Sequence, residues 1–229
     1  MATNSATEAN TRQRLLESAR DLFAERGFAK TRNRDICAQA GANIAAVNYY
    51  FGSKENLYAE AWRRAFQDSM ETHPPDGGVP PQAPAEERLQ GRIRALIHGN
   101  ADPDNKSFRI AHREMTSPTR LLEEVMRECL EPLHGAMTEL VREMLGPGAT
   151  EQQVRFCEVT VISACMGVAR WRHFHAGLRT EDVPSAPIVF DDIDAYAEHV
   201  AQFSMAGIRA MRAQVDKRTW GIDETGVEA

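Results

Sequence analysis

The chain has 229 residues, of which 42% are hydrophobic and 26% charged, and these values exclude a disordered chain. Its formal net charge of −6 argues against nucleic acid as a partner of the whole surface. No stretch approaches the roughly 18 uninterrupted apolar residues of a membrane helix, and the first ten residues are too polar for a secretory signal. We therefore expect a cytoplasmic protein with no membrane partner.

The charge is divided unevenly along the chain. Residues 1–58 hold eight basic and six acidic side chains, a net of +2, so residues 59–229 carry −8. Between Arg26 and Lys54 five basic residues stand against one acidic residue, Asp35. Because a small basic patch lies on an otherwise acidic chain, the net charge does not exclude a nucleic-acid partner.

The first 70 residues predict four helices, over Arg12–Arg26, Asn33–Ala40, Ile44–Tyr50 and Lys54–Met70, each followed or preceded by a glycine or a capping residue. The two short helices are joined by Gly41-Ala42-Asn43. This is the spacing of a helix–turn–helix, whose second helix enters a DNA major groove.

The middle of the chain begins with a loop, Thr72–Pro84, which holds five prolines and two glycines. Apolar periodicity then predicts helices over Ala85–His98, Lys106–Thr116 and Thr119–Leu145. Pro132 should kink the last of them, because proline lacks the backbone donor of a helix interior.

The segment Glu151–Phe174 is apolar almost all round. Such a helix is buried all round, so we expect it to contact its own core on one side and a second subunit on the other. A strand over its β-branched run has no partner strand in the sequence. A loop, Gly177–Phe190, and a helix, Ile193–Gln214, complete an all-α fold.

The residues of the helix–turn–helix indicate a protein family more specifically than the spacing of its helices does. The run from Thr11 to Leu57, with Arg34-Asp35-Ile36, Ala40-Gly41 and above all Tyr50-Phe51-Gly52-Ser53-Lys54-Glu55, resembles the TetR family of bacterial transcriptional regulators. The resemblance implies a homodimer of all-helical subunits, with a three-helix helix–turn–helix DNA-binding domain over 10–58 (motif about 32–51). A C-terminal helical bundle over 59–215 would bind an effector and form the dimer.

Two further segments, Asn43–Phe51 and His112–Pro118, look like a smaller branch of that family, the CecR-like regulators. The family mostly represses transcription and releases its double-stranded DNA operator when a small-molecule effector binds. The resemblance therefore implies a ligand-responsive repressor. We expect a pendulum-like shift of Lys54–Met70 to change the separation of the two recognition helices.

Candidate DNA contacts lie on and around the two motif helices. Alanine permits close approach to the bases, and Asn48 can pair bidentately with adenine. Lys54 and free backbone N–H groups at a helix start form a phosphate site. Three of the candidates have an equally good explanation without DNA. Asn43 can serve only as a helix cap, Tyr49 can pack against the protein, and Arg32 can be a solvated surface charge. The predicted contacts are Thr31, Arg32, Asn33, Arg34, Asn43, Ile44, Ala45, Ala46, Asn48, Tyr49, Tyr50, Ser53 and Lys54.

An effector pocket is expected among the helices after residue 85, lined by apolar groups with a few polar ones. Ordinary core or surface positions explain its candidate residues equally well, and the ligand is not readable from the sequence. The candidates are Phe108, His112, Arg113, Met115, His134, Arg170, Trp171 and Phe174.

The sequence predicts no catalytic residue, no metal and no cofactor. The pair His173 and His175 is two residues apart, so on a helix the two side chains point in different directions. The four cysteines form no zinc or redox spacing, and no hydrolase, nucleotide or metalloprotease motif occurs. Besides a DNA-binding regulator, the sequence leaves open a helical interaction module that has lost DNA binding, and an enzyme is disfavoured.

Overall fold

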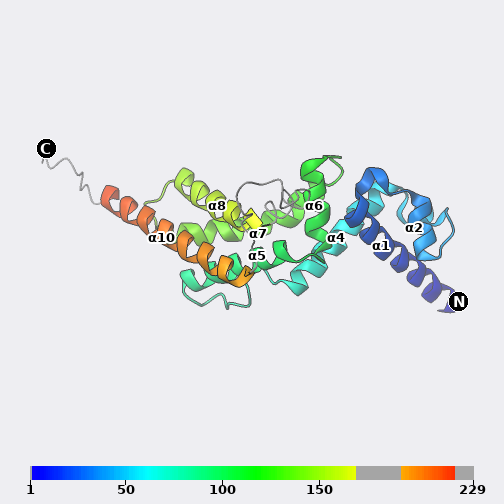
Figure 1. Cartoon of the computed structure of the whole chain (residues 1–229), viewed down its shortest axis with the longest axis horizontal. Coiled ribbons are helices and arrows are strands. Elements are labelled where there is room, and N and C mark those ends of the chain that lie inside the picture. Colours follow the sequence, from blue (N-terminus) through cyan, green and yellow to red (C-terminus); the bar gives the residue numbers. More distant parts are fainter. Residues whose placement is uncertain (1, 169–191, 220–229) are drawn as a thin grey trace, which may run out of the picture. The chain divides into compact units, whose positions relative to one another are not determined.

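A computed structural model describes residues 2–168 and 192–219, and the elements within these residues are all helices (Figure 1). The prediction of an all-α fold is confirmed for this part of the chain. The chain divides into two compact units. The first unit is Met1–Thr72 with Pro103–Glu131, and the second is His73–Asp102 with Pro132–Ala229.

The first unit contains the predicted helix–turn–helix. Its first helix begins at residue 2, earlier than predicted, because polar residues that continue a helix give no apolar periodicity. This helix breaks at Gly27, whose φ of 77° is unfavourable for other residues. The helices of the first unit are α1 (Ala2–Lys30), α2 (Asn33–Ala40), α3 (Ala46–Phe51), α4 (Lys54–Thr72), α6 (Lys106–Thr116) and the start of α7 (Glu123–Leu145).

The core of the first unit joins α1 to the motif. Ile36, Val47 and Phe51 pack with Leu22 and Phe23, since all five side chains are buried in one cluster. The α4 and α6 helices close the same cluster. Their buried members are Leu57, Tyr58, Ala61, Trp62 and Ile110.

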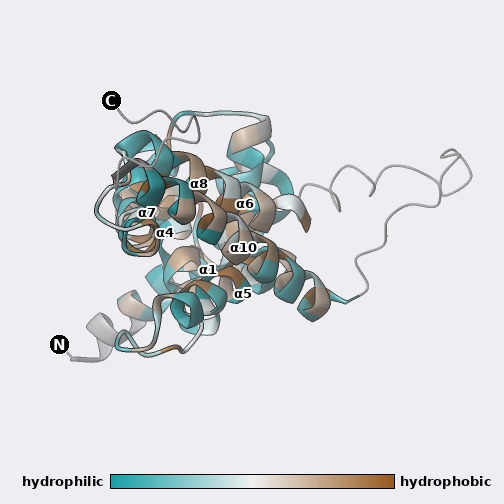
Figure 2. Ribbon diagram, turned by 90° about the vertical axis from the view of Figure 1, so that its left-hand side faces the viewer, coloured by the Kyte–Doolittle hydropathy of each residue, from teal (hydrophilic) through white to brown (hydrophobic). Residues whose placement is uncertain are grey.

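The second unit is a helical bundle built from α5 (Ala85–Ala101), the rest of α7, α8 (Glu151–Cys165) and α10 (Ile193–Thr219). A capping box between Thr150 and Gln153 starts α8. Figure 2 shows hydrophobic and hydrophilic residues side by side along the helices, as expected when each helix buries one face. Buried members of its core include Leu89, Ile93, Val141, Val161, Ala197 and Ile208.

The boundaries of α7 and α8 differ from the prediction. The α7 helix begins at Glu123 because Arg120 adopts a left-handed φ of 64°, which no helix interior accepts. It continues through Pro132, where the division between the two units falls. The α8 helix ends at Cys165. Residues 169–191, which include the rest of the predicted helix and the loop after it, lie outside the described residues.

Candidate nucleic-acid interface

The turn between α2 and α3 is fixed by local chemistry. Gly41 takes the left-handed conformation, with φ 60°, and closes α2. Asn43 Oδ1 then accepts a hydrogen bond of 2.9 Å from the backbone N–H of Ala45. Asn43 thus holds the turn before α3 and does not cap that helix, whose N-cap position is Ala45. It orients the second motif helix in the way that asparagine commonly starts a turn.

The outward face of the α3 region carries large side chains that have no place in the core. Ile44 is 65% exposed and Tyr49 is 72% exposed, and both Ala45 and Asn48 are exposed between them. The Tyr50 ring lies edge-on to that of Tyr49, with 4.8 Å between centroids. This row combines apolar surface, a side-chain amide and a phenol, which suits base edges in a major groove.

Two of the predicted contacts are wrong in this structure because their side chains are buried. Ala46 belongs to the core of the first unit. Thr31 is fully buried, and its hydroxyl lies 2.8 Å from the Gly27 carbonyl oxygen and 3.2 Å from that of Leu22. Thr31 therefore satisfies carbonyl groups at the break in α1 and does not face a phosphate.

The start of α2 presents two guanidinium groups to solvent. Arg32 and Arg34 are exposed, and the Arg34 Nε atom lies 3.4 Å from an Asp35 carboxylate oxygen. Asn33 is half-buried, and its Oδ1 atom is buried and has no hydrogen-bond partner among the described residues. These positions suit phosphate contacts beside the recognition helix.

The start of α4 is a helix N-terminus beside a lysine. Ser53 Oγ accepts a 3.1 Å hydrogen bond from the Asn56 N–H. The Lys54 ammonium donates to the Phe28 carbonyl oxygen at 2.7 Å and lies 4.0 Å from the centre of the Phe28 ring. Burial lowers the pKa of Lys54, and Glu55 opposes that shift. Two of the three ammonium protons remain for a phosphate.

The α6 helix is tied to α1 and α4, the helices before and after this motif, by two adjacent residues, which we call the α6 latch: Arg113 and Glu114. Arg113 Nε donates to the Ala24 carbonyl oxygen at 3.1 Å, and a second guanidinium nitrogen donates to that of Glu25. These carbonyls end the regular part of α1 before its break. Arg113, which the sequence predicts as a ligand contact, therefore makes a helix-capping contact in this structure.

The second latch residue joins α6 to α4. The Glu114 carboxylate accepts hydrogen bonds from the Tyr58 hydroxyl at 2.7 Å and from the Thr119 backbone N–H at 2.9 Å. Burial, with the Glu114 contact second, raises the pKa of Tyr58, which keeps the phenol protonated as a donor. The sequence indicates His112–Pro118 only as a family motif and does not reveal that Arg113 and Glu114 hold α6 in place.

The other effector candidates do not form one site among the described residues. Phe108 and His112 are half-buried neighbours on α6, with ring centroids 6.1 Å apart. Met115 is 59% exposed on the same helix, and His134 is exposed on α7 in the second unit. The remaining candidates, Arg170, Trp171 and Phe174, lie outside the described residues.

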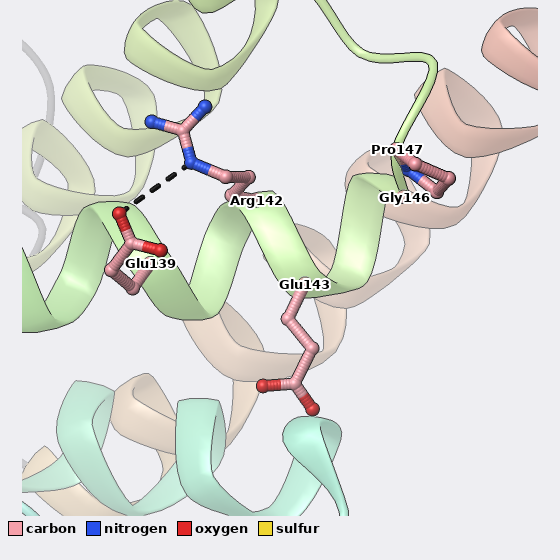
Figure 3. Close-up of a pocket in the computed structure, with 5 residues that line it drawn as sticks. All are labelled: Glu139, Arg142, Glu143, Gly146 and Pro147. Carbon is pink, nitrogen blue, oxygen red and sulfur yellow. Dashed lines mark ion pairs between the residues drawn. The ribbon is translucent and has the colours of Figure 1, made fainter.

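A cavity of about 320 Å³ lies at the end of α7 in the second unit (Figure 3). Its charged groups already pair with protein partners: Arg142 with Glu139 at 3.5 Å, and Glu143 with Arg88 at 2.6 Å. In Figure 3, Arg142 and Glu139 lie on one side of α7 and Glu143 on the other. The lining residues are Glu139, Arg142, Glu143, Gly146 and Pro147.

Across residues 2–168 and 192–219, no three His, Cys, Asp or Glu side chains gather in a way that could hold a metal ion. The helices of this same part include none that is long and apolar enough to cross a membrane. The pair His173 and His175 lies outside the described residues.

Comparison with known proteins matches both parts of the chain. The model of bacterial regulatory proteins of the tetR family matches residues 15–61, and that of the C-terminal domain of the HTH-type transcriptional dual regulator CecR matches residues 85–208. The CecR protein of Shigella flexneri is 31% identical over 153 residues, which are 62% of this chain and 68% of that protein.

Two solved structures share the fold. A TetR-like transcriptional regulator from a Rhodococcus species has a TM-score of 0.62 at 20% identity, covering 87% of this chain and 96% of that one. A transcriptional regulator from Saccharomonospora viridis in complex with choline has a TM-score of 0.63 at 20% identity, covering 85% and 95%.

Proposed function

Because the chain belongs to the TetR family of bacterial transcriptional regulators, in its CecR-like branch, we propose that it binds a double-stranded DNA operator as a homodimer under the control of a small molecule. The observation that carries the proposal is the α3 face, where Ile44 and Tyr49 remain exposed on a helix otherwise anchored in the core. We assign DNA binding to the first unit and effector binding with dimerisation to the second, so the division runs through Thr72, Asp102 and Glu131 and differs from the predicted domains over 10–58 and 59–215.

We divide the DNA contacts by chemistry. Guanidinium and ammonium groups of Arg32, Arg34 and Lys54 contact phosphates, which sets affinity and register. Asn48 and Tyr49 face base edges, with Ile44 and Ala45 available for thymine methyl groups. The remaining members of this interface are Asn33, Asn43, Tyr50 and Ser53.

The homodimer is supported by exposed apolar side chains in the second unit. Phe156 is 64% exposed and Val159 61% exposed on α8, and Phe203 is 68% exposed on α10, which packs against α8. Large apolar side chains left exposed on two helices that pack together support an interaction site on these helices. A two-fold dimer presents two recognition helices to two half-sites about one helical turn apart, or a multiple of that distance.

The response to an effector is supported by the neighbour that holds choline and requires different affinities of the ligand for two states of the protein. The α4 helix is tied to α1 through the Arg12–Glu60 and Arg20–Asp68 ion pairs, and to α6 through Trp62 and the latch. We therefore propose that α4 moves together with α1 and α6, instead of swinging alone.

Repression is the action that this geometry serves most directly, because a dimer on an operator excludes other proteins from the same DNA. The experiment is selection of bound fragments from the genome that encodes the chain, followed by fluorescence anisotropy at several salt concentrations. We expect a few fragments with paired half-sites and affinity that falls steeply with salt. Salt-sensitive binding without sequence preference, or no binding, contradicts the proposal.

Replacement of Lys54 by methionine is expected to weaken binding to all sequences to a similar degree. Methionine keeps an apolar stem beside Phe28 and removes the ammonium, so about one phosphate contact is lost in each subunit and the log–log salt slope of the dimer falls by about 2. Anisotropy at several salt concentrations measures the slope. The control is Lys30→Met, which removes an exposed charge outside the interface, and an equal fall in both variants contradicts the role of Lys54.

Replacement of Asn48 by alanine is expected to relax base preference at one position of each half-site. A bidentate contact between asparagine and adenine discriminates by about 1–3 kcal/mol, so affinity for the selected operator falls while non-specific binding stays. Competition among operator variants measures this preference. Gln39→Ala, an exposed change on α2, is the matched control, and an unchanged preference profile for Asn48→Ala excludes direct readout by that side chain.

A further inference from the structure

The break in α1 fixes the backbone of Phe28. Gly27 has φ 77° and ψ 172°, so the helical path of α1 is interrupted directly before this residue. The Thr31 hydroxyl donates to the Gly27 carbonyl oxygen at 2.8 Å, and the Thr31 backbone N–H donates to the Phe28 carbonyl oxygen at 3.3 Å. Because Thr31 is itself fully buried, these bonds tie Phe28 to the core of the first unit.

The Phe28 ring is held by two rings of the same core. Its centroid lies 5.1 Å from that of Tyr58, with 42° between the ring planes, and 6.1 Å from that of Phe23, with 23° between them. Tyr58 is 1% exposed and Phe23 is fully buried. Aromatic rings attract one another at such distances, so the half-buried Phe28 keeps one orientation.

The Lys54 ammonium makes both of its contacts to Phe28. Its Nζ atom lies over the Phe28 ring, 4.0 Å from the centroid, and donates to the Phe28 carbonyl oxygen at 2.7 Å. The electron-rich face of the ring attracts a cation. In the described part of the chain no carboxylate lies within ion-pair distance of Lys54, whereas Lys106 of the same unit pairs with Asp21.

Uncharged partners suit a lysine that has to reach a phosphate. A carboxylate partner would compensate the ammonium charge and repel the phosphate, whereas a ring and a carbonyl group leave the positive charge uncompensated. A free lysine side chain also loses rotamer freedom when it becomes fixed on DNA. A lysine that is already held over a ring has lost much of that freedom before it binds.

We propose that Phe28 is a positioning residue for operator binding: its ring and its carbonyl group hold the Lys54 ammonium ready for a phosphate of the DNA backbone. Phe28 acts through Lys54 and needs no contact with DNA of its own. This inference rests on the proposed function, because it takes the partner of Lys54 to be an operator phosphate.

The geometry is tested first, by NMR of the full chain without DNA. The chain has four lysines, so isotope-labelled lysine gives four ε-methylene signals, and Lys54→Met identifies the signal of Lys54. We expect the Lys54 protons upfield of the other three signals, because a group over the face of an aromatic ring is shielded by the ring current. Phe28→Leu should remove this shift and Phe28→Tyr should keep it. A Lys54 signal among the other three in the wild type overturns the inference.

The effect on DNA binding is tested by a double-mutant cycle, with anisotropy on the selected operator. Phe28→Leu keeps an apolar side chain but removes the ring, so Lys54 must lose more rotamer freedom on binding. Operator affinity should fall about threefold per subunit, or about tenfold for the dimer. In a Lys54→Met background the same change should alter affinity by less than about twofold, because no ammonium remains to be positioned.

Two further variants separate positioning from packing, at a temperature where all variants are folded. Phe28→Tyr keeps the ring and should bind the operator like the wild type. The matched control is Phe66→Leu, which truncates another half-buried ring of the same core, stacked on Trp62 at 5.2 Å between centroids. It should also bind like the wild type. An equal loss of affinity on Phe28→Leu with and without the Lys54 ammonium shows a packing role and overturns the inference.

Failure of this inference can be told from failure of the proposed function. A wild type that binds no operator contradicts the proposed function, and with it any role of Phe28 in DNA binding. Operator binding that is unaffected by Phe28→Leu overturns the positioning role alone and leaves DNA recognition standing.

Discussion

Aspartate in place of both Phe156 and Phe203 is expected to convert the protein from a dimer to a monomer and to abolish operator binding. The two phenylalanine side chains are 64% and 68% exposed in the single chain, and an aromatic side chain buries roughly 150–250 Å² when covered. In a two-fold interface each change occurs twice. The variant therefore loses four aromatic contacts and places four like charges in an apolar contact.

Light scattering at micromolar concentration measures the mass, with 25.6 kDa expected for one subunit. A monomer reaches one half-site only, so operator affinity should fall by about 10²-fold or more. The matched control is Met115→Asp, which charges another exposed apolar side chain (59% exposed) on α6 in the first unit. A dimeric double variant, or a monomeric wild type, would show that α8 and α10 do not form the interface.

The sequence predicted helices wherever a helix buries one face. The helix predicted over Arg12–Arg26 lies within α1, where Leu15, Ala19, Leu22 and Phe23 are all buried. The same reasoning missed residues 2–11 of α1, because polar residues that continue a helix leave no apolar pattern. It placed the start of α7 too early, since backbone φ at Arg120 follows from its surroundings and not from periodicity.

The site was predictable in type and partly in detail. The left-handed turn at Gly41 is local and the structure has it, whereas Asn43 was expected to cap the second motif helix and instead holds the turn before it. Thr31 and Ala46 were misassigned because polarity and size do not reveal which side of a short helix faces the core. Lys54 was found, but its contact with Phe28 joins residues 26 apart in sequence, which no local pattern shows.

The α6 latch was hidden for the same reason. Arg113 reaches carbonyl groups of α1, 88 and 89 residues earlier, and Glu114 reaches Tyr58, 56 residues earlier. A charged pair on a half-exposed helix is an ordinary surface feature in the sequence. Only the folded chain shows that both side chains hold α6 against the helices that carry the motif, which makes this helix part of the DNA-binding unit.

Replacement of Glu114 by alanine is therefore expected to destabilise the protein by about 2–3 kcal/mol. The change leaves the Tyr58 hydroxyl, in a side chain only 1% exposed, without its acceptor, and it also frees the Thr119 backbone N–H. Urea unfolding should show a lower midpoint with an unchanged slope. Tyr58→Phe, which removes the donor and leaves Glu114 bound to Thr119, should cost about 1 kcal/mol.

The matched control for Glu114→Ala is Glu128→Ala, which removes an exposed carboxylate of the same unit that lies 3.3 Å from Arg63. An exposed pair contributes about 0.2–1 kcal/mol, so this variant should unfold close to the wild type. At a temperature where all variants are folded, Glu114→Ala should bind the operator more weakly than Glu128→Ala, because α6 no longer holds α4 beside the motif. Equal stability and equal operator affinity of the two variants would show that the α6 latch contributes no more than an ordinary surface contact.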